Sequence, residues 1–146
     1  MRKVRSQGVI LLEDKILIAK HFNFINNEEF WLLPGGGVNE DESPEEGIIR
    51  EIKEETNLDI QIKEVLFNSM GDGRDAYSRY VTYLCKSENY NNMKIGAETN
   101  SNKKIIDLIW ASITDEDTWN KYLVSHQFYP SMKEIKGQLI KQGYIK

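Results

Sequence analysis

Three glutamates fall within five consecutive residues, at Glu51, Glu54 and Glu55. On an α-helix, residues three or four positions apart project from neighbouring faces, so these carboxylates would gather on one side. Like charges at these spacings destabilise an isolated helix by a few tenths of a kcal/mol per pair. A bound cation reverses that sign, and oxygen-only ligands suit Mg²⁺ or Mn²⁺ rather than zinc. The spacing therefore predicts a site for a hard divalent metal ion.

A run of glycines precedes the acidic cluster. The short apolar stretch from Phe30 to Leu33 predicts a strand that ends at Pro34, and Gly35, Gly36 and Gly37 follow. Glycine adopts backbone conformations closed to other residues and lets the main chain approach a ligand closely. We therefore expect a loop whose backbone touches a substrate, although a plain flexible turn would use the same residues.

Residues 43–56 predict the helix that carries the carboxylates. Ser43 suits the N-cap, Pro44 suits the first helical position, and Glu46 completes a capping box with Ser43. Asn57 follows the last turn, and asparagine tolerates the left-handed conformation that ends many helices. Both ends of this helix are therefore marked in the sequence.

The rest of the chain predicts further strands and a terminal helix. Alternating or continuous apolar patterns indicate strands, and capping residues indicate helix starts. The expected strands cover residues 3–12, 15–21, 30–33, 58–68, 77–86 and 105–113, and the expected helices cover 44–56, 114–122 and a stretch after Ser131. This order favours an α+β fold, or an α/β/α sandwich with a mixed β-sheet packed between helices.

The composition is typical of a globular domain. The 146 residues are 40% hydrophobic and 29% charged, so we expect a single domain over residues 1–146. The net charge of −4 argues against a general nucleic-acid binder, whereas a metal ion would still allow a nucleotide substrate. Cys85 is the one cysteine, and the apolar run from Val9 to Leu12 is too short for a signal peptide or a membrane span. We expect a cytoplasmic protein without a membrane partner.

Residues 36–58 resemble the Nudix box, the signature of the Nudix hydrolases. The family pattern is G-x5-E-x7-R-E-U-x-E-E-x-G-U, where U is a bulky apolar residue. Asn57 stands where the pattern has glycine, which is a mild exchange because asparagine also tolerates left-handed geometry. The strand–loop–helix layout extends the resemblance to the whole chain. The matching positions are Gly36, Glu42, Arg50, Glu51, Ile52, Glu54, Glu55 and Leu58.

The resemblance implies hydrolysis of a phosphoanhydride bond in a nucleoside diphosphate linked to another moiety. It also implies Mg²⁺ or Mn²⁺ as the cofactor, with Glu51 and Glu55 as the principal metal ligands. Glu54 would join them directly or through water, and the carbonyl of Gly35 would approach the metal. Arg50 would hold a box glutamate in place by a salt bridge. Independently, metals held by carboxylates neutralise phosphate charge, activate water and stabilise a leaving phosphate.

The resemblance implies that the general base is either a box glutamate or a glutamate on a later loop. Clustered carboxylates raise one another's pKa, which favours a box residue such as Glu54 or Glu51. Glu98 is the loop candidate, in the polar stretch 87–104. Asp107 is a further alternative, within an expected strand.

Substrate contacts are expected from the backbone of Gly36 and Gly37 and from the side chains of Arg74 and Arg79, because arginine suits phosphate. His21 is expected at a strand end, either on the surface or in a substrate cleft. Most aromatic residues belong to the core, but some stack on bases. The candidates for stacking are Phe22, Phe24, Trp31, Tyr77 and Tyr80.

Two classes of function fit these residues. The first is a metal-dependent pyrophosphohydrolase acting on a nucleoside triphosphate or on a nucleotide-sugar type of substrate such as ADP-ribose. The alternative is a non-catalytic Nudix domain that binds a nucleotide metabolite and regulates another process. Such domains typically lose box carboxylates, whereas all are present here. We expect a small-molecule nucleotide as the partner rather than nucleic acid, and a homodimer is compatible with the apolar face of the terminal helix.

Overall fold

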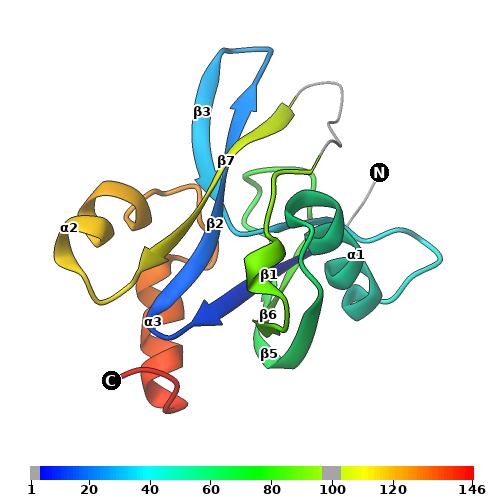
Figure 1. Ribbon diagram of the computed structural model, residues 1–146. Helices are drawn as coiled ribbons and strands as arrows, with labels where there is room; N and C mark the ends of the chain where they lie inside the picture. The colour runs from blue at the N-terminus through cyan, green and yellow to red at the C-terminus, as the bar shows by residue number, and fades with distance from the viewer. Residues whose placement is uncertain (1–3, 97–102) are drawn as a thin grey trace.

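The computed structural model describes residues 4–96 and 103–146, and Figure 1 labels its elements. The strands are β1 (Val4–Leu12), β2 (Lys15–Asn23), β3 (Glu28–Leu32), β4 (Gly35–Gly37), β5 (Ile60–Met70), β6 (Arg79–Ser87) and β7 (Lys103–Ser112). The helices are α1 (Pro44–Thr56), α2 (Glu116–Thr118) and α3 (Met132–Lys141). A 3₁₀ turn covers Tyr90–Asn92, and a π-helical turn covers Trp119–Leu123.

The strands form a mixed sheet in the order β3-β2-β1-β6-β5, with β4 beside β1 and β7 beside β2. β1 runs parallel to β6 and antiparallel to β4. The pairing of β1 with β2 joins Leu11 to Ile16 and Leu12 to Lys15, next to the turn that connects the two strands. Away from this turn the two strands diverge, and β2, β3 and β7 rise from the body of the protein (Figure 1). The divergence opens the sheet on the side where the glycines lie.

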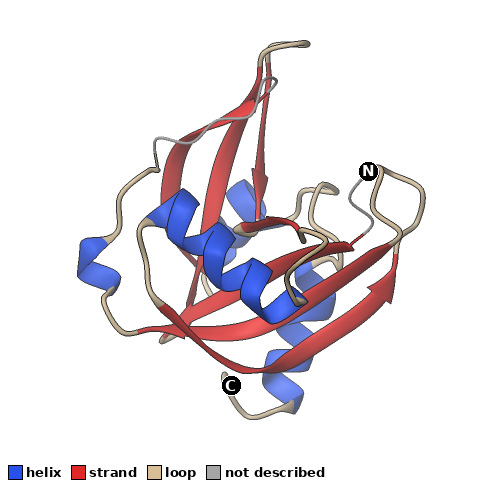
Figure 2. Cartoon of the chain, turned by 90° about the vertical axis from the view of Figure 1, so that its right-hand side faces the viewer, coloured by secondary structure: helices blue, strands red, loops and turns tan. Residues whose placement is uncertain are grey.

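Helices cover both faces of the sheet, with α1 on one side (Figure 2). Side chains alternate along β1, so that Val9 and Ile10 point to opposite faces and join different hydrophobic clusters. The cluster under α1 contains Ile10, Ile48, Ile52, Leu58, Val81, Tyr83 and Cys85. The cluster under α3 contains Val9, Ile16, Ile18, Leu84, Met132, Ile135 and Leu139. The arrangement confirms the expected mixed sheet between helices.

The ends of α1 follow the predicted capping pattern. The Ser43 hydroxyl accepts a hydrogen bond from the Glu46 amide at 3.1 Å, and the Glu46 carboxylate accepts one from the Ser43 amide at 2.9 Å. Asn57 adopts the left-handed conformation, with φ 63° and ψ 13°, and its amide donates to the Lys53 carbonyl. The Asn57 side chain also donates to the carbonyl of Asn92 at 3.0 Å, a contact that glycine cannot make.

The glycine run is a strand, so the expectation of a loop there is wrong. β4 pairs with β1 through Arg5 with Gly37, Ser6 with Gly36 and Gln7 with Gly35. A side chain at Gly35 would place a Cβ atom 2.3 Å from the Ser6 carbonyl oxygen. The absence of side chains is therefore what allows this short strand to lie against β1.

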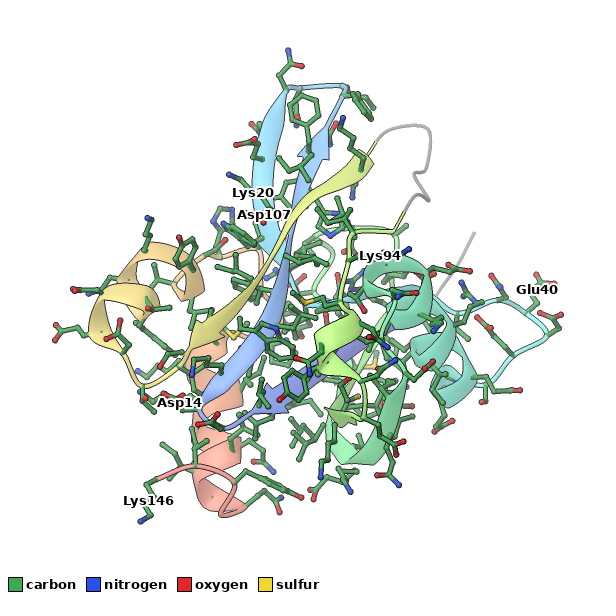
Figure 3. The ribbon with its side chains drawn as sticks, viewed as in Figure 1. Asp14, Lys20, Glu40, Lys94, Asp107 and Lys146 are labelled. Carbon is green, nitrogen blue, oxygen red and sulfur yellow. The ribbon has the colours of Figure 1, made fainter. Side chains whose placement is uncertain are left out.

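Two other regions refine the expectations. Helical residues run from Glu116 to Leu123, close to the expected helix at 114–122, but most of them form the π-helical turn. Lys94 and Gly96, which follow the 3₁₀ turn, pack on the end of α1, where the Lys94 amide donates to the Thr56 carbonyl at 3.0 Å (Figure 3). The Gly96 amide donates to the Glu55 carbonyl at 2.9 Å. Among the described residues, no helix has the length and apolar character needed to cross a membrane.

We expect Asn57→Ala to lower the free energy of unfolding by about 1–2 kcal/mol, because alanine pays a steric cost in the left-handed region. Asn57→Gly removes that cost and should stay within about 0.5 kcal/mol of the wild type. Urea unfolding of both variants checks the prediction. Equal losses in the two variants would show that the Asn92 contact, rather than backbone geometry, sets the stability of this helix end.

Candidate active site

A cleft of about 500 Å³ lies where β1 and β2 diverge. The glycine strand β4 and the last turns of α1 form one side, with Glu51 and Glu55 among the lining residues. Arg5 and Gln7 of β1 line it, and His21 and Asn23 of β2 line it from the diverging strand. Segments far apart in the sequence therefore meet in one concave surface, which is the usual form of a small-molecule site.

Two box carboxylates lie directly beside the glycine strand. Glu51 is 9% exposed, and a Cβ atom at Gly36 would lie 2.5 Å from its carboxyl carbon. Glu55 accepts a hydrogen bond from the Gly35 amide at 2.9 Å. The sequence spacing on α1 thus places these carboxylates against the backbone of β4, and only glycine at position 36 leaves room for Glu51.

Arg50 ties the acidic residues together from the other side. Its guanidinium lies 2.6 Å from Glu42, 3.0 Å from Glu51 and 3.2 Å from Glu54, and it donates to the Gly37 carbonyl at 3.2 Å. Hydrogen bonding to Glu42 raises the pKa of Arg50, and contact with Glu51 adds to this effect. Arg50 therefore remains charged, and it forms ion pairs with Glu42, Glu51 and Glu54.

Glu55 has the most perturbed carboxyl group in the cleft. Burial of its carboxylate raises its pKa to about 8, attraction to Arg5 opposes the shift, and repulsion from Glu51 and Glu54 adds to it. A carboxylate held in this way is stabilised by a nearby cation. Its one hydrogen bond among the described residues comes from the Gly35 amide, so lone pairs remain for a further ligand.

The oxygen atoms of Glu51, Glu55 and β4 are the candidate ligands for a divalent metal. Within the described part of the chain, no three His, Cys, Asp or Glu side chains are gathered into a metal site. Mg²⁺ needs only one or two carboxylates when waters and substrate phosphates complete its shell. Glu51, Glu55 and the backbone of β4 supply oxygen ligands of that kind, so these residues fit Mg²⁺ or Mn²⁺ and do not form a closed cage.

The opposite wall of the cleft is aromatic and basic. His21 stacks on Phe30 with ring centroids 5.6 Å apart and planes 8° apart. Burial lowers the pKa of His21 to about 3, and the charges of Arg5 and Lys103 contribute, so the imidazole is neutral at neutral pH. Lys103 lies over the Phe30 ring at 5.5 Å. The cleft thus has an acidic side at α1 and a basic side at β7.

The other predicted contact residues lie in different places. Arg74 lines the cleft, but it bonds to Asp72 and to the His126 carbonyl and lies over the Tyr129 ring at 4.7 Å. It therefore fastens the loop before β6 to the loop before α3. Arg79 is exposed, donates to Asn68 at 2.6 Å and is not among the residues that line the cleft.

The candidate bases also separate. Glu54 is bonded to Arg50 and is not among the residues that line the cleft. Asp107 is exposed on β7 opposite Lys20 of β2, outside the cleft lining, and the two side chains lie close together in Figure 3. Glu98 lies outside the described residues. The backbone contact of Gly96 with Glu55 brings the chain to the carboxylate-bearing helix two residues before Glu98.

Of the aromatic candidates, Tyr77 and Tyr80 line the cleft. Trp31 instead packs on Tyr122, and Phe22 packs on Phe24 in the β2–β3 hairpin. Sequence reasoning missed Arg5 and Gln7. Their signal is polar residues at alternating positions of a strand whose later residues are apolar, which indicates one polar patch on a buried strand.

We expect Gly36→Ala to lower the free energy of unfolding by about 1–3 kcal/mol, because the added methyl group would displace the Glu51 carboxylate. Gly137→Ala is the matched control, since a Cβ atom there meets nothing within 4 Å on α3. That control should gain roughly 0.5–1 kcal/mol from helix propensity. Chemical unfolding of both variants makes the comparison, and a neutral Gly36→Ala would contradict the close packing of Glu51.

Comparison with known proteins places this geometry in a family. The NUDIX domain profile matches residues 2–132. An RNA pyrophosphohydrolase of Ectopseudomonas mendocina is 38% identical over 66 residues, which are 44% of this chain and 39% of that protein. The chain therefore spans well under half of the length of this curated relative.

Solved structures show the same fold. An ADP-ribose pyrophosphatase from Streptococcus suis has a TM-score of 0.57 and 25% identity, covering 79% of this chain and 77% of its own. A NUDIX hydrolase from Nitrosomonas europaea has a TM-score of 0.67 and 16% identity, covering 97% and 90% of the two chains. Together with the box helix and the mixed sheet, the profile match over most of the chain shows that this protein belongs to the Nudix hydrolase family.

Proposed function

We propose that this protein is a metal-dependent pyrophosphohydrolase that cuts a phosphoanhydride bond in a nucleoside diphosphate linked to another moiety. The observation that carries the proposal is the placement of Glu51 and Glu55 of α1 on the cleft, against the backbone of β4. We further propose that residues 1–146 act as one domain. Family membership and the intact set of box carboxylates support this reading over a non-catalytic nucleotide-binding domain.

The relatives narrow the substrate only to a class. The curated relative is named an RNA pyrophosphohydrolase, and the Streptococcus suis neighbour is named an ADP-ribose pyrophosphatase. Both names specify hydrolysis at a pyrophosphate group and differ in what that group is attached to. The nucleoside triphosphate and nucleotide-sugar classes both stay in the proposal, and a 5′-phosphorylated RNA joins them, against the expectation of no nucleic acid.

Each box residue has a proposed role. Glu51 and Glu55 would hold Mg²⁺ or Mn²⁺, with Glu54 as a further ligand directly or through water and Gly35 contributing its carbonyl. When bound, the metal would neutralise phosphate charge and lower the pKa of a water molecule. Arg50 would keep Glu51 and Glu54 in place, since its guanidinium already contacts both.

The backbone of Gly36 and Gly37 would lie along the substrate. Both residues line the cleft, and neither has a side chain to keep a phosphate away from the strand. Tyr77 and Tyr80 line the same cleft, where an aromatic ring would stack on a base or a ribose. Arg74 would contribute indirectly, by fixing the loop that carries Tyr77.

The experiment is a substrate panel assayed with Mg²⁺ or Mn²⁺. It contains nucleoside triphosphates, ADP-ribose and a 5′-triphosphorylated oligoribonucleotide, with the released products separated by chromatography. We expect at least one class to be hydrolysed, and activity to be lost on chelation of the metal. Tight binding of a nucleotide without turnover would instead support the regulatory alternative and overturn the enzyme proposal.

Glu55→Gln is the decisive variant in that assay. It should lose turnover and also lose the rise in Tm that Mg²⁺ gives the wild type, because one charged ligand is removed. In chelator its Tm should equal or exceed that of the wild type, since the variant buries no destabilised carboxylate. Glu88→Gln, at an exposed site, is the matched control. A fully active Glu55→Gln would contradict the proposed metal site.

The general base is tested by comparing Glu98→Gln with Glu54→Gln. Loss of a general base lowers kcat by about 10²-fold or more. We propose Glu98 as the loop candidate and Glu54 as the box candidate. Because Glu54 is also a proposed metal ligand, the base is the residue whose glutamine variant loses the acidic limb of the kcat–pH profile at saturating metal as well as kcat. If Glu98→Gln changes kcat by less than about threefold, against the ~10²-fold expected of a base, the role returns to the box.

A further inference from the structure

Arg5 is a buried cation beside the proposed metal site. It is 9% exposed, it lines the cleft, and it pairs across the sheet with Gly37 of β4. Its charge acts on the carboxylate of Glu55, where attraction to Arg5 is the largest effect opposing the raised pKa. Burying a charged group has a large free-energy cost unless the group is paired, so the buried Arg5 guanidinium would be stabilised by a negatively charged partner.

The neighbours of Arg5 fix its direction without neutralising it. Its Nε donates to the Gln7 side-chain oxygen at 3.3 Å, and an Nη donates to the Leu33 carbonyl at 2.9 Å. Gln7 is itself 3% exposed and donates to the Thr82 hydroxyl at 2.9 Å and to the Tyr129 carbonyl at 2.7 Å. Both atoms that accept from Arg5 are therefore neutral. The Gln7 amide nitrogen is fixed by Thr82 and Tyr129, so its oxygen stays directed at Arg5.

The described residues place no carboxylate within salt-bridge distance of Arg5, and its hydrogen bonds use only part of the guanidinium. A guanidinium offers five N–H donors in a rigid fork. The remaining donors belong to a side chain that lines the cleft. A buried arginine with neutral partners and unused donors at a concave surface is a preformed site for an anion.

The charged and titratable groups around Arg5 also determine how well this part of the cleft can bind an anion. Lys103 of β7 lies close enough for its charge and that of Arg5 to affect the same imidazole, His21, which is neutral. Tyr80, which pairs with Arg5 across β1 and β6, bonds through its hydroxyl to Asp75. Glu51, Glu55 and Asp75 supply negative charges in the same cleft, and the proposed metal would compensate the two glutamates. The result is a cation at the border between the acidic and basic sides.

We propose that Arg5 of β1 binds a phosphoryl group of the substrate through its guanidinium, beside the carboxylates of α1, and that Gln7 is the residue that positions it. The inference rests on the proposed function for the identity of the substrate. Anion binding itself does not depend on the proposed function, because it follows from the buried Arg5 and its neutral hydrogen-bond partners. Phosphate matches the guanidinium fork, and a nucleoside diphosphate derivative is the chemical class that carries such a group beside a metal.

The test measures inorganic pyrophosphate binding to the full-length protein in chelator, so that no metal contributes. Calorimetry and the pyrophosphate-dependent rise in Tm report the affinity. We expect the wild type to bind and the affinity to fall with added salt. Arg5→Gln and Arg5→Lys should bind about tenfold or more weakly, because charge-assisted hydrogen bonds, and in the lysine variant the fork geometry, are lost.

Gln7→Glu tests the positioning role without removing Arg5. The new carboxylate would pair with the guanidinium, so pyrophosphate affinity should also fall by about tenfold. The Tm without anion should fall as well, because a carboxylate cannot donate to the Tyr129 carbonyl as the Gln7 amide does. Lys63→Gln, at an exposed lysine on β5, is the charge-matched control and should bind like the wild type. If Arg5→Gln does not fold, Gln7→Glu tests on its own whether anion binding depends on the Arg5 guanidinium.

Two outcomes would overturn the proposal. One is wild-type protein that does not bind pyrophosphate in chelator. The other is folded Arg5→Gln or Gln7→Glu protein that binds with wild-type affinity. Arg5-dependent anion binding without hydrolysis of any nucleotide would keep this inference and overturn the proposed function. Hydrolysis of a nucleotide with anion binding unaffected by Arg5→Gln would do the reverse.

Discussion

The contact of Arg50 with Glu42, Glu51 and Glu54 is the interaction on which the site depends. Carboxylates three and four positions apart on one helix repel one another, and burial makes that repulsion stronger. A single guanidinium that reaches Glu42, Glu51 and Glu54, and the Gly37 carbonyl as well, joins α1 to β4. Removing the cation would leave buried charges without a partner, which costs far more than the pair itself contributes.

That constraint explains why the neighbouring backbone must be glycine. Holding Glu51 next to β4 leaves no space for a Cβ atom at Gly36, and pairing β4 with β1 leaves none at Gly35. The sheet then diverges on this side, because β1 is committed to β4 and β6 while β2 pairs with β3 and β7. The cleft is the space between β1, which pairs with β4 and β6, and β2, which pairs with β3 and β7. The charged side chains of α1 and β1 both line it.

The sequence predicts most of what is local. The capping box, the left-handed Asn57 and the alternation of apolar residues are decided within a few residues, and the structure contains each of them. The glycine run by itself predicts a loop, and it forms a strand because it pairs with β1, which is far away in the sequence. Pairing between distant segments is set by tertiary packing, which composition does not reveal. Arg5 escapes prediction for the same reason. A single arginine in a strand is expected on the surface, and Arg5 is buried because β1 pairs with both β4 and β6.

One part of the cleft favours a cation and the neighbouring part favours an anion. On the α1 side, carboxylates stay together because Arg50 and backbone amides stabilise them, and Glu55 is left with a raised pKa that favours a cation. On the β1 side, Arg5 is buried among neutral acceptors, which favours an anion. A metal–phosphate pair is the ligand that satisfies both sides at once, since neither charge is then left unpaired. The cleft is therefore complementary to a charge distribution, and on the proposed function the aromatic and basic residues of β3, β6 and β7 would contact the parts of the substrate beyond the phosphates.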